Sequence, residues 1–560
     1  MQRFHVLGTD AKGPVRRVSV NGSNGNSVQV KLHRYAPVGK GDVLCIDSTH
    51  PNQMAIQSAE DPKDLIKLTP PFSCADQLRL GSTNFNVKLT EIVSEEDYQN
   101  YQFLEQFHYR SSGLLNVDDD GESTPSADLG GRRAVLLCYL RIGMNWQAVG
   151  YIELQMPLMM VKPRHVLFAT PFHHPKRPIA WQAWNTDALK KYVNTTVRIA
   201  RVVTSPEFRG LGLAKTMITA ATQFSKDRWH IKGVRPLFIE ISAEMLKYVD
   251  FVTSSGLHLV GYTEGNLARV SKDILSMQRG QKISSGIMSL QKKYLSRLNA
   301  AAKALGRDVA TAISKLQEVS SSPELLNSLS AEDWYLLKTV LRSPIPYYLK
   351  GLDEYSDAYI VENVKTTSKP VASRTTVRST MSNLVIEGLR IASVFNVPDT
   401  SSVRRIMDCF GLQGQTMATH ILGPLDIEAS PGNIFFIAGA SGCGKSVLLK
   451  ALDPSFSNPQ LTIRRKRPTN YSHTAGWLRD VASEDPLIQY FSERWGMERA
   501  LTALNQVGLS EAFVYLKPYQ LLSRGQRYRA KLADLSLRDE PVWLIDEFCA
   551  DLDPLTAKIV

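Results

Sequence analysis

The residues with the clearest chemistry are Gly439-Ala440-Ser441-Gly442-Cys443-Gly444-Lys445-Ser446, which lie between the apolar run 434–438 and the helix-forming segment 447–450. Glycines at this spacing let successive backbone N–H groups face phosphate oxygens, and a helix N-terminus attracts anions. Lys445 would reach the β and γ oxygens, and the Ser446 hydroxyl would bind Mg²⁺. We therefore predict a strand, a phosphate loop and a helix that hold a nucleoside triphosphate. A glycine turn without a ligand is the alternative.

Two adjacent carboxylates, Asp546 and Glu547, follow the apolar stretch 542–545. That stretch predicts a buried strand. Hydrolysis of a triphosphate needs a metal ligand and a group that polarises water side by side. We expect Asp546 to hold Mg²⁺ through water and Glu547 to polarise the attacking water.

Two further motifs flank this acidic pair. Leu522-Ser523-Arg524-Gly525-Gln526 precedes it and Ala550-Asp551-Leu552-Asp553-Pro554 follows it. They resemble the signature motif and the D-loop of ABC-type ATPases, with Arg524 in place of a glycine, and all four motifs occur in the order of that family. The resemblance implies a homodimer that encloses ATP. Ser523, Gly525 and Gln526 of one subunit would cover the phosphates that Lys445 of the other holds.

The switch histidine and the last strands of an ABC domain have no counterpart before Val560. We expect the domain to be C-terminally incomplete, either because the chain is a fragment of a longer reading frame or because it binds ATP and hydrolyses it poorly. A sheet that lacks its last strands would leave apolar surface uncovered. Gln489 is the candidate for the Q-loop of the family, and a surface glutamine is the alternative.

Composition bounds the remaining possibilities. The 560 residues are 43% hydrophobic and 21% charged, which predicts three or four globular domains. No stretch approaches the ~20 apolar residues of a membrane span, and the first residues do not form a secretory signal. We expect a soluble cytoplasmic protein, although an ATPase recruited to a membrane partner stays open. The six cysteines include no Cys-x-x-Cys pair, which indicates reduced thiols and no zinc site.

The net charge of +12 is compatible with a polyanionic partner such as DNA or RNA. Basic residues concentrate between Arg279 and Lys315, in a segment of helical composition, and again at 464–467. Binding of phosphates requires that such residues gather on one surface. A solvated face or a connector between domains is the alternative for both segments.

The N-terminal half contains a second glycine turn, Arg209-Gly210-Leu211-Gly212-Leu213-Ala214, between the β-branched segment 195–203 and the helix-forming segment 215–221. A strand, a glycine turn and a helix again create an anion site from backbone amides. The lysine and hydroxyl of a nucleotide–Mg²⁺ site are missing here. We therefore expect a pyrophosphate ligand that brings no metal.

This segment resembles motif A of GCN5-related N-acetyltransferases (GNAT), with Arg209, Gly212 and Ala214 at the defining positions. The resemblance implies binding of acetyl-CoA or another acyl-CoA. The neighbouring segments suit that fold, in which a hairpin precedes the turn and a strand, a helix and a strand follow it: 133–140, 148–154, 236–241, 244–249 and 258–262. An unrelated α/β domain with a glycine turn is the alternative.

That family has no fixed catalytic base. Glu240, near the end of a strand, could deprotonate an amine through water, and Tyr248 or Tyr262 could protonate the leaving thiolate. His108 and Tyr109, at the end of an early helix, are the other candidates. For these two, packing of an aromatic face on the sheet is the alternative.

The two halves together resemble a small family of ABC-type ATPases fused to a predicted acetyltransferase domain, and more loosely the Mom-like phage enzymes that modify adenine in DNA. We expect an α/β multidomain chain with four parts: a β-rich module at 1–80, a GNAT-like domain at 81–270, a basic helical linker at 271–375 and an ABC domain at 376–560. The leading hypothesis is an acyl-CoA-dependent transferase that acts on a nucleic acid, with the ABC dimer using ATP to clamp or reposition this substrate. The alternatives are an ATP-driven remodelling protein with a degenerate transferase fold and a transporter ATPase subunit.

Overall fold

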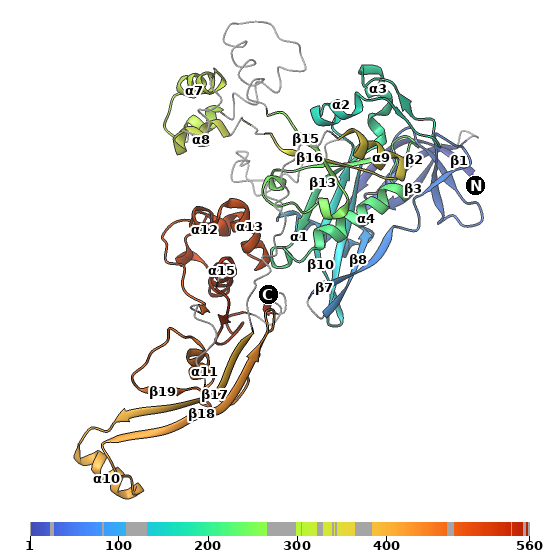
Figure 1. The fold of residues 1–560 in the computed structure, drawn as a ribbon. Coiled ribbons are helices and arrows are strands. Elements are labelled where there is room, and N and C mark those ends of the chain that lie inside the picture. The colour runs from blue at the N-terminus through green and yellow to red at the C-terminus, as the bar shows by residue number, and fades with distance from the viewer. Residues whose placement is uncertain are drawn as a thin grey trace. The chain divides into compact units, whose positions relative to one another are not determined.

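The structure is a computed structural model that describes residues 2–22, 27–80, 83–107, 132–265, 298–303, 305–321, 329–338, 341, 344–364, 383–466, 475–538, 540–552 and 556–557 (Figure 1). The chain divides into two compact units of mixed α/β structure. The first unit comprises Met1–Ser205 and Gly212–Thr367, and the second comprises Ser368–Val560 with the short segment Pro206–Leu211.

The first unit begins with an antiparallel six-stranded sheet of order β3-β2-β1-β4-β5-β6. Its strands are β1 Gln2–Lys12, β2 Val15–Gly22, β3 Ser27–His33, β4 Val43–Ile46, β5 Met54–Gln57 and β6 Leu65–Lys67. Alternating apolar residues fill its core, among them the fully buried Val18, Val20 and Ile56. This sheet runs from Gln2 to Lys67, within the range 1–80 of the predicted β-rich module.

A second, eight-stranded sheet follows, in the order β15-β16-β14-β13-β10-β9-β8-β7. Its strands are β7 Ser73–Leu80, β8 Thr83–Glu91, β9 Arg133–Ile142, β10 Asn145–Gln155, β13 Thr196–Thr204, β14 Phe238–Ser242, β15 His258–Tyr262 and β16 Pro346–Gly351. Only β13 and β14 pair in parallel, and helix α4 (Leu213–Asp227) connects them. The hairpin, the strand before the glycine turn and the helix after it are thus confirmed.

Two segments of this unit differ from the sequence prediction. Residues 244–249 contain a short 3-10 turn, Glu244–Lys247, instead of an α-helix. Residues 346–351 were expected in a helical linker, but they form β16 between β14 and β15, and helix α9 (Glu354–Asn363) follows. Strand β16 buries Tyr347 and Leu349, so burial of its apolar side chains favours pairing with the sheet.

Helices cover both faces of the second sheet. Helix α1 (Glu95–Glu105) places Tyr101 against Tyr151, with ring centroids 5.0 Å apart. The preceding residue, Gly150, faces Met217 of α4. Because successive residues of a strand point to opposite faces, α1 and α4 lie on opposite sides of β10.

An aromatic core closes the end of the sheet beyond β13. It combines side chains from helix α2 (Lys162–Phe168), the short hairpin of β11 (Phe172–His173) and β12 (Ala180–Trp181), β14 and α9. Its aromatic members are Phe168, Phe172, Trp181, Phe238, Tyr347 and Tyr359. Helix α3 (Thr186–Tyr192) packs beside them through Ala188 and Tyr192. Helices α7 (Val309–Ser321) and α8 (Ala331–Lys338) lie within the predicted linker 271–375, and residues 279–297 of its basic segment lie outside the described residues.

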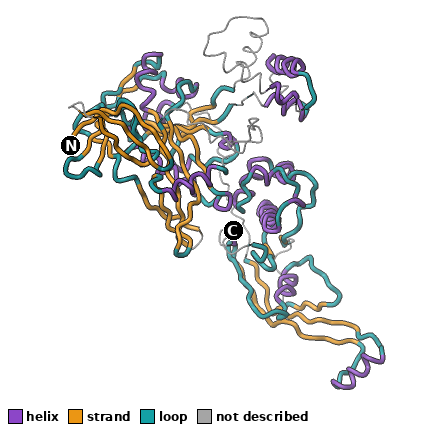
Figure 2. The backbone as a smooth tube through the Cα atoms, turned by 180° about the vertical axis from the view of Figure 1, so that it is seen from behind, coloured by secondary structure: helices purple, strands orange, loops and turns teal. Residues whose placement is uncertain are grey.

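The second unit starts with a long hairpin of β17 (Leu384–Asn396) and β18 (Thr416–Ala429), and β19 (Leu461–Arg464) pairs with β17. Helix α10 (Ser401–Phe410) sits at the far end of this hairpin (Figures 1 and 2). A parallel pair, β20 (Gly476–Trp477) and β21 (Trp543–Leu544), and the helices complete the unit. The helices are α11 Lys445–Leu452, α12 Leu487–Trp495, α13 Met497–Gln506, α14 Ala512–Tyr515 and α15 Arg524–Leu537.

The apolar run 434–438 is not a buried strand, so this part of the prediction was wrong. The side chains of Ile434 and Phe436 are 96% and 88% exposed. A strand needs neighbours that satisfy its backbone groups, and no described strand pairs with this run. This exposed apolar run lies directly before the phosphate loop.

Candidate functional site

The phosphate loop takes the conformation that its glycines predict. Gly442 and Gly444 have φ angles of 78° and 93°, in the left-handed region that favours glycine. Gly444 caps helix α11, and a Cβ at this position would meet Cγ2 of Ile421 at 2.8 Å. A Cβ at Gly439 would meet Sγ of Cys443 at 2.7 Å. Both ends of the loop are therefore closely packed around glycine. The backbone N–H groups of the loop lie at the N-terminus of α11, where anions are favoured.

Lys445 is the first residue of α11 and folds back over this loop. Its Nζ donates to the carbonyl oxygens of Gly439 and Ala440, both at 2.9 Å. A lysine ammonium has three donors and binds phosphate as a point charge. The loop therefore holds a cation beside exposed amides, and the residues present fit a triphosphate. Ser446 follows as the second residue of α11, where its hydroxyl would bind Mg²⁺.

The acidic pair is joined to the phosphate loop by a shared core. Leu448 and Leu452 of α11 pack in one cluster with Leu544 of β21, and Asp546 and Glu547 come shortly after this strand. Both acidic residues are exposed. Strand β21 is two residues long, and Trp543 is half exposed, so the buried strand expected at 542–545 is shorter than predicted.

The signature turn is the N-terminus of α15. Ser523 caps the helix, because its Oγ accepts from the N–H of Gln526 at 3.3 Å and its own N–H donates to Oε1 of Gln526 at 3.0 Å. This reciprocal capping box fixes the turn. A Cβ at Gly525 would meet no atom closer than 3.5 Å, and Nε of Arg524 pairs with Oδ1 of Asp551 at 2.6 Å. The turn thus offers backbone amides and a hydroxyl around a small, open position.

Gln489 does not lie in a loop. It belongs to α12, and its Nε2 donates to Oε1 of Glu493, four residues further along the same helix, at 2.9 Å. Such i, i+4 pairs are ordinary features of an exposed helix surface. The structure favours the surface glutamine that the sequence left as the alternative.

Comparison with known proteins identifies the second unit. A family model described as ABC transporter matches residues 422–550. The cytochrome c biogenesis ATP-binding export protein CcmA of Xylella fastidiosa is 32% identical to this chain over 169 residues, which are 28% of this chain and 74% of that protein. The chain belongs to the ABC transporter family of ATP-binding proteins. The phosphate loop, the signature turn and the acidic pair all lie within the range that the ABC model matches.

Two other relatives are similar over the same share of the chain or slightly less. The aliphatic sulfonates import ATP-binding protein SsuB 2 of Paracoccus denitrificans is 30% identical over 174 residues, 28% of this chain and 62% of that protein. The ATP-binding protein SyrD of Pseudomonas syringae is 30% identical over 155 residues, 25% of this chain and 27% of that protein. The second glycine turn, at 209–214, lies outside the range of the ABC model. Among the described residues, no helix has both the length and the apolar character needed to cross a membrane.

The second glycine turn of this ABC protein follows β13. Gly210 and Gly212 have φ angles of 81° and 90°, and Gly212 caps the fifteen-residue helix α4. Ala214 lies in the first turn of that helix, and Arg209 donates its N–H to the carbonyl of Pro206 at 3.4 Å. A Cβ at Gly212 would meet nothing closer than Cδ1 of Leu78, at 3.9 Å. A Cβ at Gly210, in the same turn, would meet the carbonyl oxygen of Asn505 at 2.2 Å, so the turn is open at Gly212 and closely packed at Gly210.

Glu240, proposed from the sequence as a base, is held in a buried ion pair. Its side chain is 2% exposed, and its Oε2 accepts from NH1 of Arg164 at 2.7 Å and from the hydroxyl of Tyr347 at 2.5 Å. Burial, with the nearby Glu240 carboxylate, raises the pKa of Tyr347 well above its usual value, so this phenol stays a donor. These contacts favour a structural role of Glu240 over proton abstraction. The sequence could not show them, because Arg164 and Tyr347 are 76 and 107 residues away.

The other transferase candidates are His108, Tyr109, Tyr248 and Tyr262. His108 and Tyr109 lie outside the described residues. Tyr248 and Tyr262 are both partly exposed, which leaves their side chains accessible from solvent.

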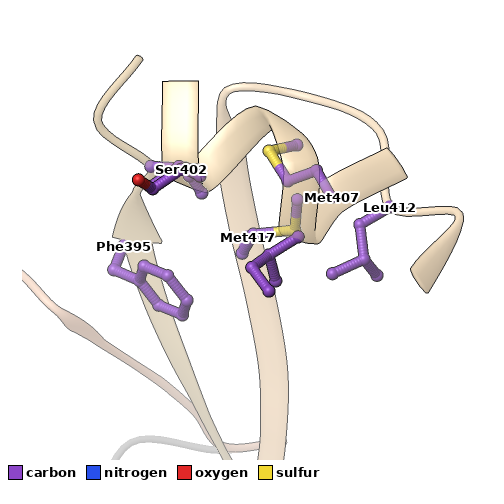
Figure 3. Close-up of a pocket in the computed structure, with 8 residues that line it drawn as sticks. Phe395, Ser402, Met407, Leu412 and Met417 are labelled. Carbon is purple, nitrogen blue, oxygen red and sulfur yellow. The ribbon is translucent and has the colours of Figure 1, made fainter. Parts of the chain in front are cut away.

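An apolar pocket of about 320 Å³ lies in the ABC unit, at the end of the β17–β18 hairpin (Figure 3). Side chains of α10 and of both strands line it, including Phe395, Met407, Leu412 and Met417. It contains no cation and no glycine turn among its lining residues. The pocket is therefore unsuited to phosphates and is separate in chemistry from the ATP site.

Proposed function

We propose that this protein is an ABC-type ATPase that closes as a homodimer around ATP and that carries an acyl-CoA-dependent N-acyltransferase in its first unit. The observation that carries the proposal is the presence of two glycine turns of different chemistry, each of which caps a helix: Gly444 before α11 and Gly212 before α4. The first is followed by a lysine and a serine, as a nucleotide–Mg²⁺ ligand requires, and the second is not.

In the ATPase, the roles follow from the residue types. Lys445 and the loop amides would hold the β- and γ-phosphates, while Ser446 and Asp546 would hold Mg²⁺, which supplies charge neutralisation when bound. Glu547 would orient the attacking water. Ser523, Gly525 and Gln526 would contact the phosphates held by the second copy, so ATP would join the two subunits.

Two features of the first unit support acyl-CoA as the ligand of the second turn. The parallel pairing of β13 with β14 ends at Ile199 and Ile241, whereas β13 continues to Thr204. Opposite the step from Glu153 to Leu154, β13 carries one extra residue, Ala200. Strands that part and bulge in this way are common beside binding sites. The amides at the start of α4 would then hold the pyrophosphate, as the resemblance to motif A implies.

We propose nucleic acid, DNA or RNA, as the acceptor class, because the net charge of +12 favours a polyanion. The attacking group would be an amine of the acceptor, and the CoA thiol would leave. His108 and Tyr109 remain the candidates for moving the proton, since the carboxylate of Glu240 is already paired. ATP-driven closure of the dimer would clamp the acceptor during transfer.

The comparisons favour one alternative function. The relatives include an export protein and an import ATP-binding protein, named for cytochrome c biogenesis and for aliphatic sulfonates. A transporter ATPase subunit that works with a separate membrane protein would share the same ATP site. In that case the first unit would serve as a binding module.

The test is transfer of labelled acetyl groups from acetyl-CoA to DNA, tRNA and polyamines, with and without ATP. We expect label in nucleic acid, and we expect its loss in Lys445→Ala but not in Lys450→Ala, a control on the same helix. A Gly212→Val variant should lose acetyl-CoA binding and keep ATP binding, because a branched side chain is strained at a φ of 90°. Absence of label in every acceptor, with normal ATP hydrolysis, would overturn the transferase half. Recovery of activity only with a membrane partner would support the transporter subunit.

A further inference from the structure

The segment after the acidic pair has an unusual backbone. Glu547 and Cys549 have φ angles of 51° and 61°, and Lys232 is the one other non-glycine residue with a positive φ in the described part of the chain. A side chain with a Cβ is disfavoured in this left-handed region. Such residues persist only where surrounding contacts hold them, so the contacts of this segment decide where the Glu547 carboxylate lies.

One hydrogen bond fixes the turn directly. The N–H of Cys549 donates to the hydroxyl oxygen of Tyr528 at 2.8 Å, and Tyr528 is 5% exposed on α15. Within the turn, the N–H of Ala550 donates to the carbonyl of Glu547 at 3.0 Å, and the N–H of Leu552 donates to the carbonyl of Cys549 at 3.1 Å. Burial raises the pKa of Tyr528, so the phenol remains neutral. The backbone at Cys549 is thus tied to α15.

A second contact ties the next part of the segment to the same helix. Nε of Arg524, the first residue of α15, pairs with Oδ1 of Asp551 at 2.6 Å. A cation at a helix N-terminus is disfavoured by the helix dipole, and the first turn of α15 has no acidic residue. Asp551 therefore compensates a charge that the helix itself does not stabilise. Both ends of the segment 549–551 are held by the helix that carries the signature motif.

We propose that Tyr528 is a positioning residue for ATP hydrolysis: its hydroxyl holds Cys549 in the left-handed conformation and so sets the direction of the Glu547 carboxylate. Arg524 assists through Asp551. The proposal rests on the proposed role of Glu547. It makes the orientation of the water-polarising group depend on the helix whose Ser523 and Gly525 would contact the nucleotide of the second copy.

The first experiment replaces Tyr528 by phenylalanine in the full chain, which removes the acceptor oxygen and keeps the ring. We expect kcat for ATP hydrolysis to fall about tenfold, which corresponds to the loss of an interaction made in the transition state, with KM changed less than about twofold. Amide hydrogen exchange at Cys549 should become faster in the same variant without nucleotide. The matched control is Tyr519→Phe, since Tyr519 is equally buried and its hydroxyl donates to Asp480 at 2.8 Å.

The second experiment tests the backbone conformation itself. Glycine adopts the left-handed region without strain. In Cys549→Gly the backbone at this position should therefore keep its conformation without the tyrosine hydroxyl. We expect the double variant Tyr528→Phe/Cys549→Gly to recover most of the lost kcat, and Cys549→Gly alone to stay near the wild-type rate.

Three outcomes would overturn the inference. An unchanged kcat in Tyr528→Phe, a loss that Cys549→Gly does not restore, or faster exchange at Cys549 without any change in kcat would each do so. Failure of the proposed function has a different pattern: Lys445→Ala and Glu547→Gln would then hydrolyse ATP at the wild-type rate. The Tyr528 variants alone would not produce that result.

Discussion

At the scale of single residues, the ATP site depends on positions where a Cβ has no room. Gly444 and Gly432 have nearly the same φ, 93° and 88°, but their surroundings differ. A Cβ at Gly444 would meet Ile421 at 2.8 Å, whereas one at Gly432 would meet nothing within 4 Å. Substitutions at these two glycines therefore distinguish the effect of backbone strain, which both would share, from the effect of a steric clash, which only Gly444 would have.

We predict that Gly444→Ala abolishes ATP binding, because the loop must move away from Ile421 to admit the methyl group. Gly432→Ala should retain the ATP affinity of the wild type and lose only about 1 kcal/mol of stability from the left-handed backbone. Titration with a fluorescent ATP analogue and chemical denaturation would measure the two effects. Equal ATP affinity in both variants would contradict the prediction.

A second residue-scale prediction concerns the buried ion pair of the first unit. Glu240→Gln would leave the guanidinium of Arg164, which is fully buried, without its carboxylate, and breaking such a pair costs about 3–5 kcal/mol of unfolding free energy. The exposed pair of Lys162 and Glu264 is the control, and Glu264→Gln should cost less than ~1 kcal/mol. Urea denaturation distinguishes the two. If Glu240→Gln were as stable as the wild type but lost acyl transfer, the base role would be restored.

At the scale of elements, α10 and the far end of the hairpin that carries it stand apart from the core of the ABC unit, whereas Ile386, Leu389 and Ile391 of β17 are part of that core. The helix has no buried residue, although Val403, Ile406, Met407 and Phe410 recur at the spacing of one helical face. The polar residues of its other face include Arg404, which pairs with Asp399 at the start of the helix. The apolar face and the pocket beneath it therefore contribute little to the stability of the unit.

We predict that Phe410→Ser changes the unfolding free energy by less than about 0.5 kcal/mol, as surface substitutions usually do. Phe491 of α12 is fully buried, and Phe491→Ala should cost about 3–5 kcal/mol. Thermal or chemical denaturation of both variants gives the comparison. A large loss in Phe410→Ser would show that α10 is covered in solution.

The sequence indicates the elements better than their partners. The helix after each glycine turn was predictable, because glycine spacing and helix-forming residues are local features. The run 434–438 was not, since an apolar segment becomes a strand only when other strands pair with it. Strand β16 was missed for a similar reason: its neighbour β15 ends at Tyr262, more than eighty residues earlier in the chain. Tyr528 carries no local motif, and only the structure shows its contact with Cys549.

At the scale of the whole molecule, the first unit joins two sheets through buried polar side chains. His33 ends β3 of the first sheet and Glu91 ends β8 of the second, with Nε2 and Oε1 3.5 Å apart. Burial raises the pKa of Glu91 to about 7, although the hydrogen bond from the N–H of Phe72 and the charge of Arg228 both act to lower it. Burial, Arg16 and Arg228 lower the pKa of His33 to about 4. In a second buried pair of this unit, Arg132 lies 2.6 Å from Asp42.

These two pKa shifts make the unfolding free energy depend on pH in opposite directions. The contribution of Glu91 is present below its ordinary pKa of 4.5 and is lost as the pH rises to about 7, whereas that of His33 is present above 6.5 and is lost as the pH falls to about 4. Glu91→Gln removes the pH dependence that Glu91 contributes, because an amide does not titrate. We expect the difference in unfolding free energy, variant minus wild type, to increase by on the order of 3 kcal/mol from pH 4.5 to pH 7.5. Denaturation curves at the two pH values test this, and a constant difference would contradict it.

The pairing of β15 with β16 has a practical consequence for engineering this chain. The N–H of Thr263 donates to the carbonyl of Ile345 at 2.9 Å, so the chain leaves the sheet and returns to it at adjacent points. The described residues between these two points include helices α7 and α8. A short flexible bridge between Thr263 and Ile345 would keep both strands in register, because closing a short loop costs little entropy. A fluorescent reporter or the new termini of a circular permutant could be placed at the junction of Thr263 and Ile345. A reporter there would monitor the first unit and leave both glycine turns unchanged.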